Sequence, residues 1–410
     1  MRKMIKLFSC LASLALAVAV SPALAQTAAA TPAATASAVP TPAVSVDGLV
    51  DVGYTYNFTN GSKGTVGAGN VGTFFNNQDG SYAVNLAEVD IKATQGAGTG
   101  MLSLVSGANN GNLGLNAGAD ILQAYVALAE GQWTFTGGRF VTWMGNEVIQ
   151  SKSNWNYSRS LMFWYTIPLW HNGLSVNYTT SDSKLGITGY LVNGWNDSTT
   201  PYIAPWSNQG PTYGLQVAIK PDSVFNVILN GIAGPVGGSA NVTGTTTPVY
   251  NGDTRWVGEA IIAYNPNSTW SFALDAEYGT AGTNGVTMTA GDGTTTFTSA
   301  PFFGADLYAK YQIQSDWDLA LRLEELKDTY GQYGIYGAAP QAKSNDVEAR
   351  EATLTIEHEF TPNLTVRLEG RMDMAYSGGT QFSTTTTPTG PFAGGEGSQF
   401  TTALGATYNF

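Results

Sequence analysis

The sequence predicts an all-β fold, a transmembrane antiparallel β-barrel of about 16 strands in which one long loop folds inward as a constriction. Three observations lead to this prediction. Polar and apolar residues alternate over segments of about 10 residues, which is the length of a membrane-spanning strand. The linkers between these segments alternate between short and long. The chain also begins with the features of an export signal.

The first 25 residues have the features of a secretory signal peptide. A basic start precedes a short apolar run at 11–20, and the Ala-Leu-Ala at 23–25 fits the small-x-small cleavage pattern. The apolar run is too short to span a bilayer. The only cysteine, Cys10, lies within this signal, so the mature chain would contain neither cysteine nor disulfide.

Residues 26–45 consist almost entirely of Ala, Thr, Pro and Ser, which predicts a disordered leader. A plug helix is the alternative, but the prolines and the lack of Leu and Phe argue against it. The barrel is therefore expected to occupy residues 46–410.

The charge balance limits the partners that the protein can have. Removal of the signal takes away three of the 18 basic residues, which leaves 15 against 30 acidic ones. Nucleic acid is not expected to bind, because phosphate recognition needs concentrated Lys and Arg. No later stretch reaches the roughly 18 apolar residues of a membrane helix, so any membrane crossing must be made by strands.

The segment WSFALDAEYG shows the strand pattern most clearly. Trp270, Leu274 and Tyr278 fall on its apolar face, with aromatic residues at both ends as membrane interfaces favour. Asp275 and Glu277 fall on the polar face. Similar periods define 16 candidate strands, near 48–58, 81–94, 99–106, 119–129, 132–140, 172–181, 184–193, 211–220, 223–232, 254–265, 269–279, 302–313, 316–326, 348–360, 363–374 and 399–410.

A soluble β-sandwich also alternates, and the linkers argue against it. Short turns on one rim and long loops on the other are typical of an outer-membrane barrel, whereas long structureless tracts are uncommon in compact domains. A barrel of this size encloses a water-filled channel. The short turns lie at 220–223, 265–268, 314–316 and 361–363, and the long tracts at 231–253, 280–300, 328–346 and 376–397.

Three motifs carry a resemblance to a known family: Gly138-Arg139-Phe140, Glu147-Val148-Ile149 and NWNYSRS from Asn154. The chain from about residue 46 resembles the second family of outer-membrane β-barrel porins of Gram-negative bacteria. The resemblance implies an outer-membrane location and a channel for passive diffusion of small hydrophilic solutes and ions. Lipids and lipopolysaccharide are then expected partners. A homo-oligomer is a further option that the resemblance leaves undecided. The terminal Phe410 resembles the signal read by the barrel-assembly machinery.

The segment after Phe140 interrupts the alternation and is expected to fold into the lumen. There it would need to satisfy its own backbone groups, and its charged and aromatic side chains would shape the constriction. Purely structural roles are the alternative for these residues. The constriction candidates are Glu147, Lys152, Trp155, Tyr157 and Arg159.

Inward-facing charges along the strands are expected to line the pore. Acidic residues outnumber basic ones on these faces, which predicts a modest preference for cations. The predicted pore-lining charges are Arg139, Glu259, Asp275, Glu277, Asp306, Lys310, Arg322, Glu324, Arg367, Glu369, Arg371 and Asp373.

No catalytic residue, metal site or cofactor is expected. The two histidines, His171 and His358, show no pattern of a catalytic triad or of a metal-binding pair. The alternative to a pore is a structural or adhesive surface barrel whose lumen is closed by loops. Single-channel conductance distinguishes the two.

Overall fold

A computed structural model describes most of the chain beyond residue 40. The signal peptide, most of the leader and most of the four long tracts lie outside the described residues. The described residues are 41–58, 70, 73, 75–108, 110, 115, 118–195, 211–235, 249–250, 254–280, 286–290, 293–297, 301–329, 347–377 and 398–410.

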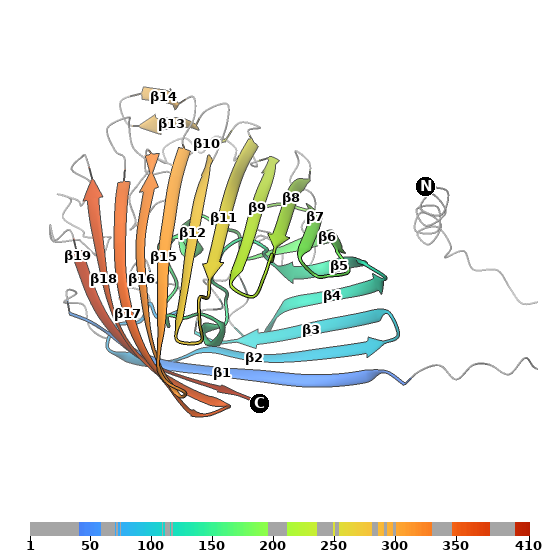
Figure 1. Ribbon diagram of the computed structural model, residues 1–410. Helices are drawn as coiled ribbons and strands as arrows, with labels where there is room; N and C mark the ends of the chain where they lie inside the picture. The colour runs from blue at the N-terminus through green and yellow to red at the C-terminus, as the bar shows by residue number, and fades with distance from the viewer. Residues whose placement is uncertain are drawn as a thin grey trace, which may run out of the picture. The chain divides into compact units, whose positions relative to one another are not determined.

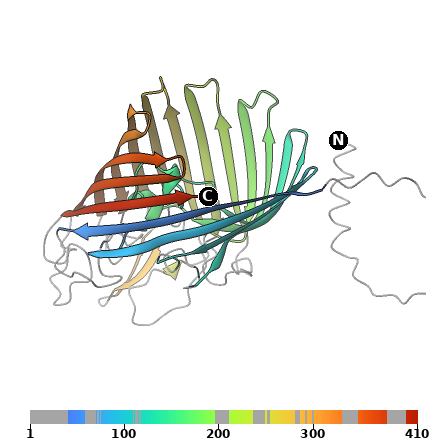
Figure 2. The ribbon, with the colours of Figure 1, turned by 90° about the horizontal axis from the view of Figure 1, so that it is seen from below.

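Sixteen antiparallel strands close into a barrel, which confirms the predicted fold class and strand number. Each strand pairs with its neighbours along the chain, and β1 closes the ring by pairing with β19 (Figures 1 and 2). The barrel strands are β1 Ala43–Asn57, β2 Ser81–Gln95, β3 Gly98–Ser106, β4 Asp120–Glu130, β5 Trp133–Val141, β6 Trp170–Thr179, β7 Leu185–Val192, β8 Thr212–Ile219, β9 Phe225–Pro235, β11 Thr254–Tyr264, β12 Trp270–Thr280, β15 Pro301–Gln314, β16 Trp317–Asp328, β17 Val347–Thr361, β18 Leu364–Ser377 and β19 Ser398–Asn409.

Two details differ from the sequence prediction. Strand β1 begins at Ala43, three residues before the expected start of the barrel, because the alternation of small and valine residues already begins there. A small sheet also forms within two of the long tracts, from β10 Val249–Tyr250, β13 Val286–Ala290 and β14 Gly293–Phe297. These strands are too short, and too rich in Gly and Thr, to show a membrane-strand period.

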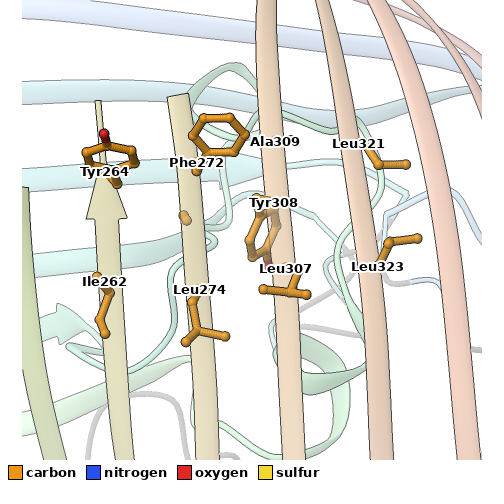
Figure 3. Close-up of a pocket in the computed structure, with 10 residues that line it drawn as sticks. Ile262, Tyr264, Phe272, Leu274, Leu307, Tyr308, Ala309, Leu321 and Leu323 are labelled. Atoms are coloured by element: carbon orange, nitrogen blue, oxygen red, sulfur yellow. The ribbon is translucent and has the colours of Figure 1, made fainter. Parts of the chain in front are cut away.

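Burial follows the alternation along each strand. On β12, Phe272 and Tyr278 are exposed on the outer face, whereas Asp275 and Glu277 are buried on the inner face. Figure 3 shows the outer face, where Ile262, Leu274, Leu307, Leu321 and Leu323 surround a shallow apolar hollow of about 370 Å³. A surface of this composition suits contact with hydrocarbon.

The short turns hold their predicted places on the rim where the barrel begins and ends. In the turn between β8 and β9, Asp222 Oδ1 accepts hydrogen bonds from the N–H groups of Val224 and Phe225, at 2.8 and 2.9 Å. Asn267 does the same for Thr269 and Trp270 in the turn before β12. Among the described residues, no helix is both long and apolar enough to cross a membrane.

The interior of the barrel holds the segment between β5 and β6, residues 142–169, which we call the inserted loop. It contains the 3-10 helix η1, Ser151–Ser153, and the short helix α2, Leu161–Tyr165. Figure 1 shows this green segment within the ring of strands. Apolar loop residues such as Ile149, Leu161 and Phe163 belong to the buried core, so this core lies inside the barrel.

Candidate functional site

The inserted loop is folded by its own polar residues, most of which belong to the NWNYSRS motif. The Asn154 side chain donates to Val148 O and accepts from Val148 N, at 2.8 and 2.9 Å. Arg159 donates to the carbonyl oxygens of Tyr157, Val148 and Ile149. Burial lowers the pKa of Arg159 to about 10, so this side chain remains charged at neutral pH. The motif therefore gives the loop a defined internal structure.

Carboxylates of the barrel wall accept hydrogen bonds from the loop backbone. Glu369 accepts from the N–H groups of Tyr157 and Ser158 at 2.7 and 3.0 Å. Glu324 accepts from Leu161 and Met162 at 2.7 and 2.6 Å. These hydrogen bonds satisfy loop N–H groups that are removed from water.

Two further carboxylates hold the beginning of the loop in the same way. Glu259 accepts from the Gly145 N–H at 2.8 Å, and Asp275 accepts from the Asn146 N–H at 3.0 Å. The loop is thus attached to β11, β12, β16 and β18 through main-chain groups. Such contacts depend on the loop conformation more than on its side chains.

Wall arginines complement the carboxylates by donating to loop carbonyl groups. Arg367 donates to Ser151 O at 2.5 Å, and Arg371 donates to Arg159 O at 2.6 Å. Arg322 donates to Ser158 O at 2.8 Å and forms ion pairs with the loop residue Glu147 and the wall residue Glu351, both at 2.6 Å. Arg322 therefore joins a wall charge to a loop charge, whereas Arg367 and Arg371 reach the loop through its carbonyl groups.

Two glycines of the wall make room for the Tyr157 ring. Gly53 of β1 and Gly405 of β19 lie directly opposite each other, and a Cβ on either would overlap Tyr157. The Tyr157 hydroxyl donates to Asp51 at 2.8 Å and accepts from the Asn85 side chain at 2.6 Å. Burial, followed by the nearby Asp51 charge, raises the pKa of Tyr157 well above its usual value. We call the space that Gly53 and Gly405 leave for the Tyr157 ring the glycine notch.

The five constriction candidates divide into two groups. Glu147, Tyr157 and Arg159 are buried in the contact between loop and wall. Lys152 is exposed, and Trp155 is half-buried with its ring edge-on to Tyr308. Among these five, Lys152 and Trp155 are therefore the side chains that remain accessible to water.

Eleven of the twelve predicted pore-lining charges are buried, whereas side chains that line an open channel would face water. The physical reason is that several of them satisfy loop backbone groups. Lys310 is the exception, since it is half-exposed and pairs with Asp318 at 2.7 Å. Arg139 lies elsewhere on the wall, with its guanidinium 3.5 Å from the centre of the Trp170 ring.

Sequence reasoning did not identify Glu351, Asn85, Gly53 or Gly405 as site residues. Glu351 carries the available signal, because it occupies a polar-face position of its strand. The two glycines also occupy inward positions, but a glycine in a strand gives no indication of which distant side chain needs the space.

A closed barrel of 16 antiparallel strands with an apolar outer face and an inserted loop defines the class of outer-membrane channel proteins. The family described as "Putative beta-barrel porin-2, OmpL-like" matches residues 43–410, and the chain belongs to this family. It is thus a porin of the Gram-negative outer membrane, a channel for passive diffusion, which confirms the predicted family, location and function.

Comparisons with other known proteins agree with this fold. The outer membrane channel DcaP of Acinetobacter baumannii is 12% identical over 90% of this chain and 97% of its own, with a TM-score of 0.59. OmpT of Vibrio cholerae is 12% identical over 91% and 100%, with a TM-score of 0.55. An anion-selective porin from Comamonas acidovorans is 12% identical over 90% and 100%, with a TM-score of 0.55. No curated protein sequence matches the chain.

Proposed function

We propose that small hydrophilic solutes cross the barrel beside the inserted loop, which acts as a fixed constriction. The observation that carries this proposal is the attachment of the loop backbone to several strands by Glu369, Glu324 and Arg371. A segment held at so many points keeps one position in the lumen. The size of the passage is then a property of the folded barrel.

The alternative, a structural barrel closed by its loops, is favoured by one observation. Eleven of the predicted pore-lining charges are buried, so the loop fills much of the wall region that these charges occupy. Purified protein in a planar bilayer distinguishes the two proposals. Stepwise current supports the pore, whereas a folded, heat-modifiable protein that produces no current supports the closed barrel.

Ion selectivity in this proposal depends on inward charges that keep access to water. Asp90, Asp318 and Glu357 on the wall are partly exposed, as is Lys310, and Lys152 on the loop is exposed. Because acidic residues outnumber basic ones over the inward-facing positions of the strands as a whole, we propose a modest preference for cations. This preference is opposite in sign to that of the anion-selective porin from Comamonas acidovorans.

Lys152→Glu tests this assignment. The substitution replaces an exposed positive charge of the loop by a negative one, so the reversal potential in a salt gradient should shift further towards cation preference. Lys184→Glu, in the turn between β6 and β7, makes the same charge change outside the lumen and should leave the reversal potential unchanged. Equal shifts in both variants would place Lys152 away from the ion path.

Two further proposals concern the association of this chain with copies of itself and with the barrel-assembly machinery. OmpT of Vibrio cholerae has been solved in a trimer form, 10% identical over 90% of this chain and 100% of its own with a TM-score of 0.57, and we propose that this chain forms a homo-oligomer. We further propose that the barrel-assembly machinery binds the strand ending at Phe410, whose backbone pairs with Gly48. Lipids and lipopolysaccharide would surround the outer face, and no catalytic activity is proposed.

A further inference from the structure

Four charged side chains lie together on the outer face of the barrel, which is largely apolar. Glu325 and Lys327 of β16 lie directly opposite Arg350 and Glu348 of β17. All four point outward, since residues between them, such as Leu326, are buried on the inner side. On the described strands, exposed outward-facing charges away from the short turns occur only here. We call these four residues the charged patch.

The charged patch lies at one edge of the membrane-facing band. Strand β16 begins after a short turn at Trp317, and Glu325 and Lys327 follow eight and ten residues later. With a rise of about 3.4 Å per residue and a strand tilt of about 40°, they lie roughly 21–26 Å beyond Trp317 along the barrel axis. The apolar band of an outer-membrane barrel is about 25 Å tall. The charged patch therefore reaches the level of the lipid headgroups on the side of the long loops.

Within the charged patch, Arg350 compensates both carboxylates. It pairs with Glu348 at 2.7 Å and with Glu325 at 3.6 Å. None of the ion pairs between described residues includes Lys327, whose side chain is exposed. The Lys327 ammonium is therefore the positive charge that the patch offers to an anionic headgroup.

An apolar hollow lies on the same face, on the side of the patch nearer the short turns. It has a volume of about 370 Å³, and Figure 3 shows Leu307, Leu321 and Leu323 around it. Leu323 is the outward-facing residue next to Glu325, and Leu321 is the one before it. Leu321 lies about 14 Å along β16 from Glu325, within the roughly 15 Å depth of one membrane leaflet. An acyl chain whose headgroup lies at the patch therefore reaches the hollow.

We propose that the charged patch and the hollow form one binding site for the lipid A part of lipopolysaccharide, a phosphorylated and acylated glycolipid of the outer leaflet. Lys327 binds a phosphate group as a point charge, and an acyl chain fills the hollow. The inference rests on the proposed contact between the outer face and lipopolysaccharide, and it adds one defined site to that contact. Its test does not depend on current, so it can fail while the pore proposal holds, and the reverse.

The test is native mass spectrometry of folded, lipid-free protein in detergent, mixed with diphosphoryl lipid A in EDTA so that no metal ion bridges the charges. The wild type should retain a single lipid A molecule. Lipid A without phosphate groups should bind roughly tenfold more weakly, because a hydrogen bond between charged groups is lost. Lys327→Glu should weaken the binding of diphosphoryl lipid A by at least as much, and Lys327→Arg should restore it.

Two further variants separate the hollow from the charge. Ala309→Phe places a large side chain at the hollow, so it should also lower the retention of lipid A while it keeps the heat-modifiable mobility of a folded barrel. Lys184→Glu is the matched control. It makes the same charge change as Lys327→Glu, but in the turn between β6 and β7, and should retain lipid A as the wild type does.

Equal retention by the wild type and Lys327→Glu, or equal retention of the two forms of lipid A, would overturn the proposal. Unchanged retention by Ala309→Phe would also overturn it, since the hollow would then hold no chain. Several weakly held lipid A molecules, or tighter retention of phosphatidylglycerol, would show general lipid contact only and would contradict a defined site. Wild-type oligomers that Lys327→Glu dissociates would assign the patch to a second copy of the chain instead.

Discussion

Arg322 is the side chain that joins loop and wall most directly. It is fully buried, and its guanidinium binds Glu147 of the loop, Glu351 of the neighbouring strand and the Ser158 carbonyl oxygen. Replacing a buried ion pair by apolar groups on both sides is often neutral, whereas removing one partner leaves uncompensated charges. Removal of the Arg322 guanidinium would leave Glu147 and Glu351 as such uncompensated charges.

Arg322→Leu should therefore destabilise the folded barrel by about 3–5 kcal/mol, the usual cost of breaking a buried ion pair. The measurement is the free energy of unfolding in urea, or the heat-modification temperature where unfolding is irreversible. Arg350→Leu is the control, since Arg350 is half-exposed and pairs with Glu348 at 2.7 Å on the surface. Exposed pairs contribute about 0–1 kcal/mol, so comparable losses in both variants would contradict the assignment.

At the scale of elements, the contact between the inserted loop and the closing strands depends on the glycine notch. Strands β1 and β19 place Gly53 opposite Gly405, and Tyr157 fills the space between them and Asp51. The same two strands close the barrel. The position of the loop is therefore coupled to the closure of the cylinder.

Gly405→Val should displace Tyr157, because the new side chain overlaps its ring. Overpacking of this kind costs about 1–3 kcal/mol, and the released loop should give larger and noisier single-channel currents. Gly370→Val is the control, since a Cβ at that outward-facing glycine meets Phe400 at 3.8 Å, an ordinary contact. Wild-type currents and stability in Gly405→Val would show that Tyr157 does not need the notch.

The turn between β8 and β9 provides a pH-dependent prediction. Hydrogen bonds from the N–H groups of Phe225 and Val224 hold the pKa of Asp222 below its usual value. A lowered folded pKa contributes stability above the unfolded pKa of about 3.9, and that contribution is lost as the pH falls through the folded pKa. Asp222→Asn should therefore be less stable than the wild type at neutral pH, and the difference should shrink in acid. A pH-independent difference would contradict the assignment.

The strands could be predicted from the sequence because lipid on one side and water or loop on the other impose a strict period of two. Even the weakly patterned β3 and β7 follow it. The partners of the inward charges could not be predicted in this way. Arg322 and Glu147 are 175 residues apart, and the period shows only that Arg322 faces inward. The burial of most inward charges could not be predicted either, because the period does not distinguish water from an inserted loop.

At the scale of the whole molecule, the barrel wall and the inserted loop form one unit. The apolar outer face fits the membrane, while charges from β11 to β18 fix the loop across the interior. In the proposed function, these wall charges determine how much of the lumen stays open to solutes.

The sharpest test of this dependence is the single-channel conductance of the wild type and of Glu369→Gln in planar bilayers. The substitution replaces one of the two carboxylate oxygens that accept from Tyr157 and Ser158 by an NH₂ group, so the Tyr157 and Ser158 N–H groups are left with a single, neutral acceptor oxygen between them. We expect stepwise currents from the wild type and larger, less uniform steps from the variant. Identical steps from both proteins, or a folded wild type that passes no current, would contradict the role of the wall charges.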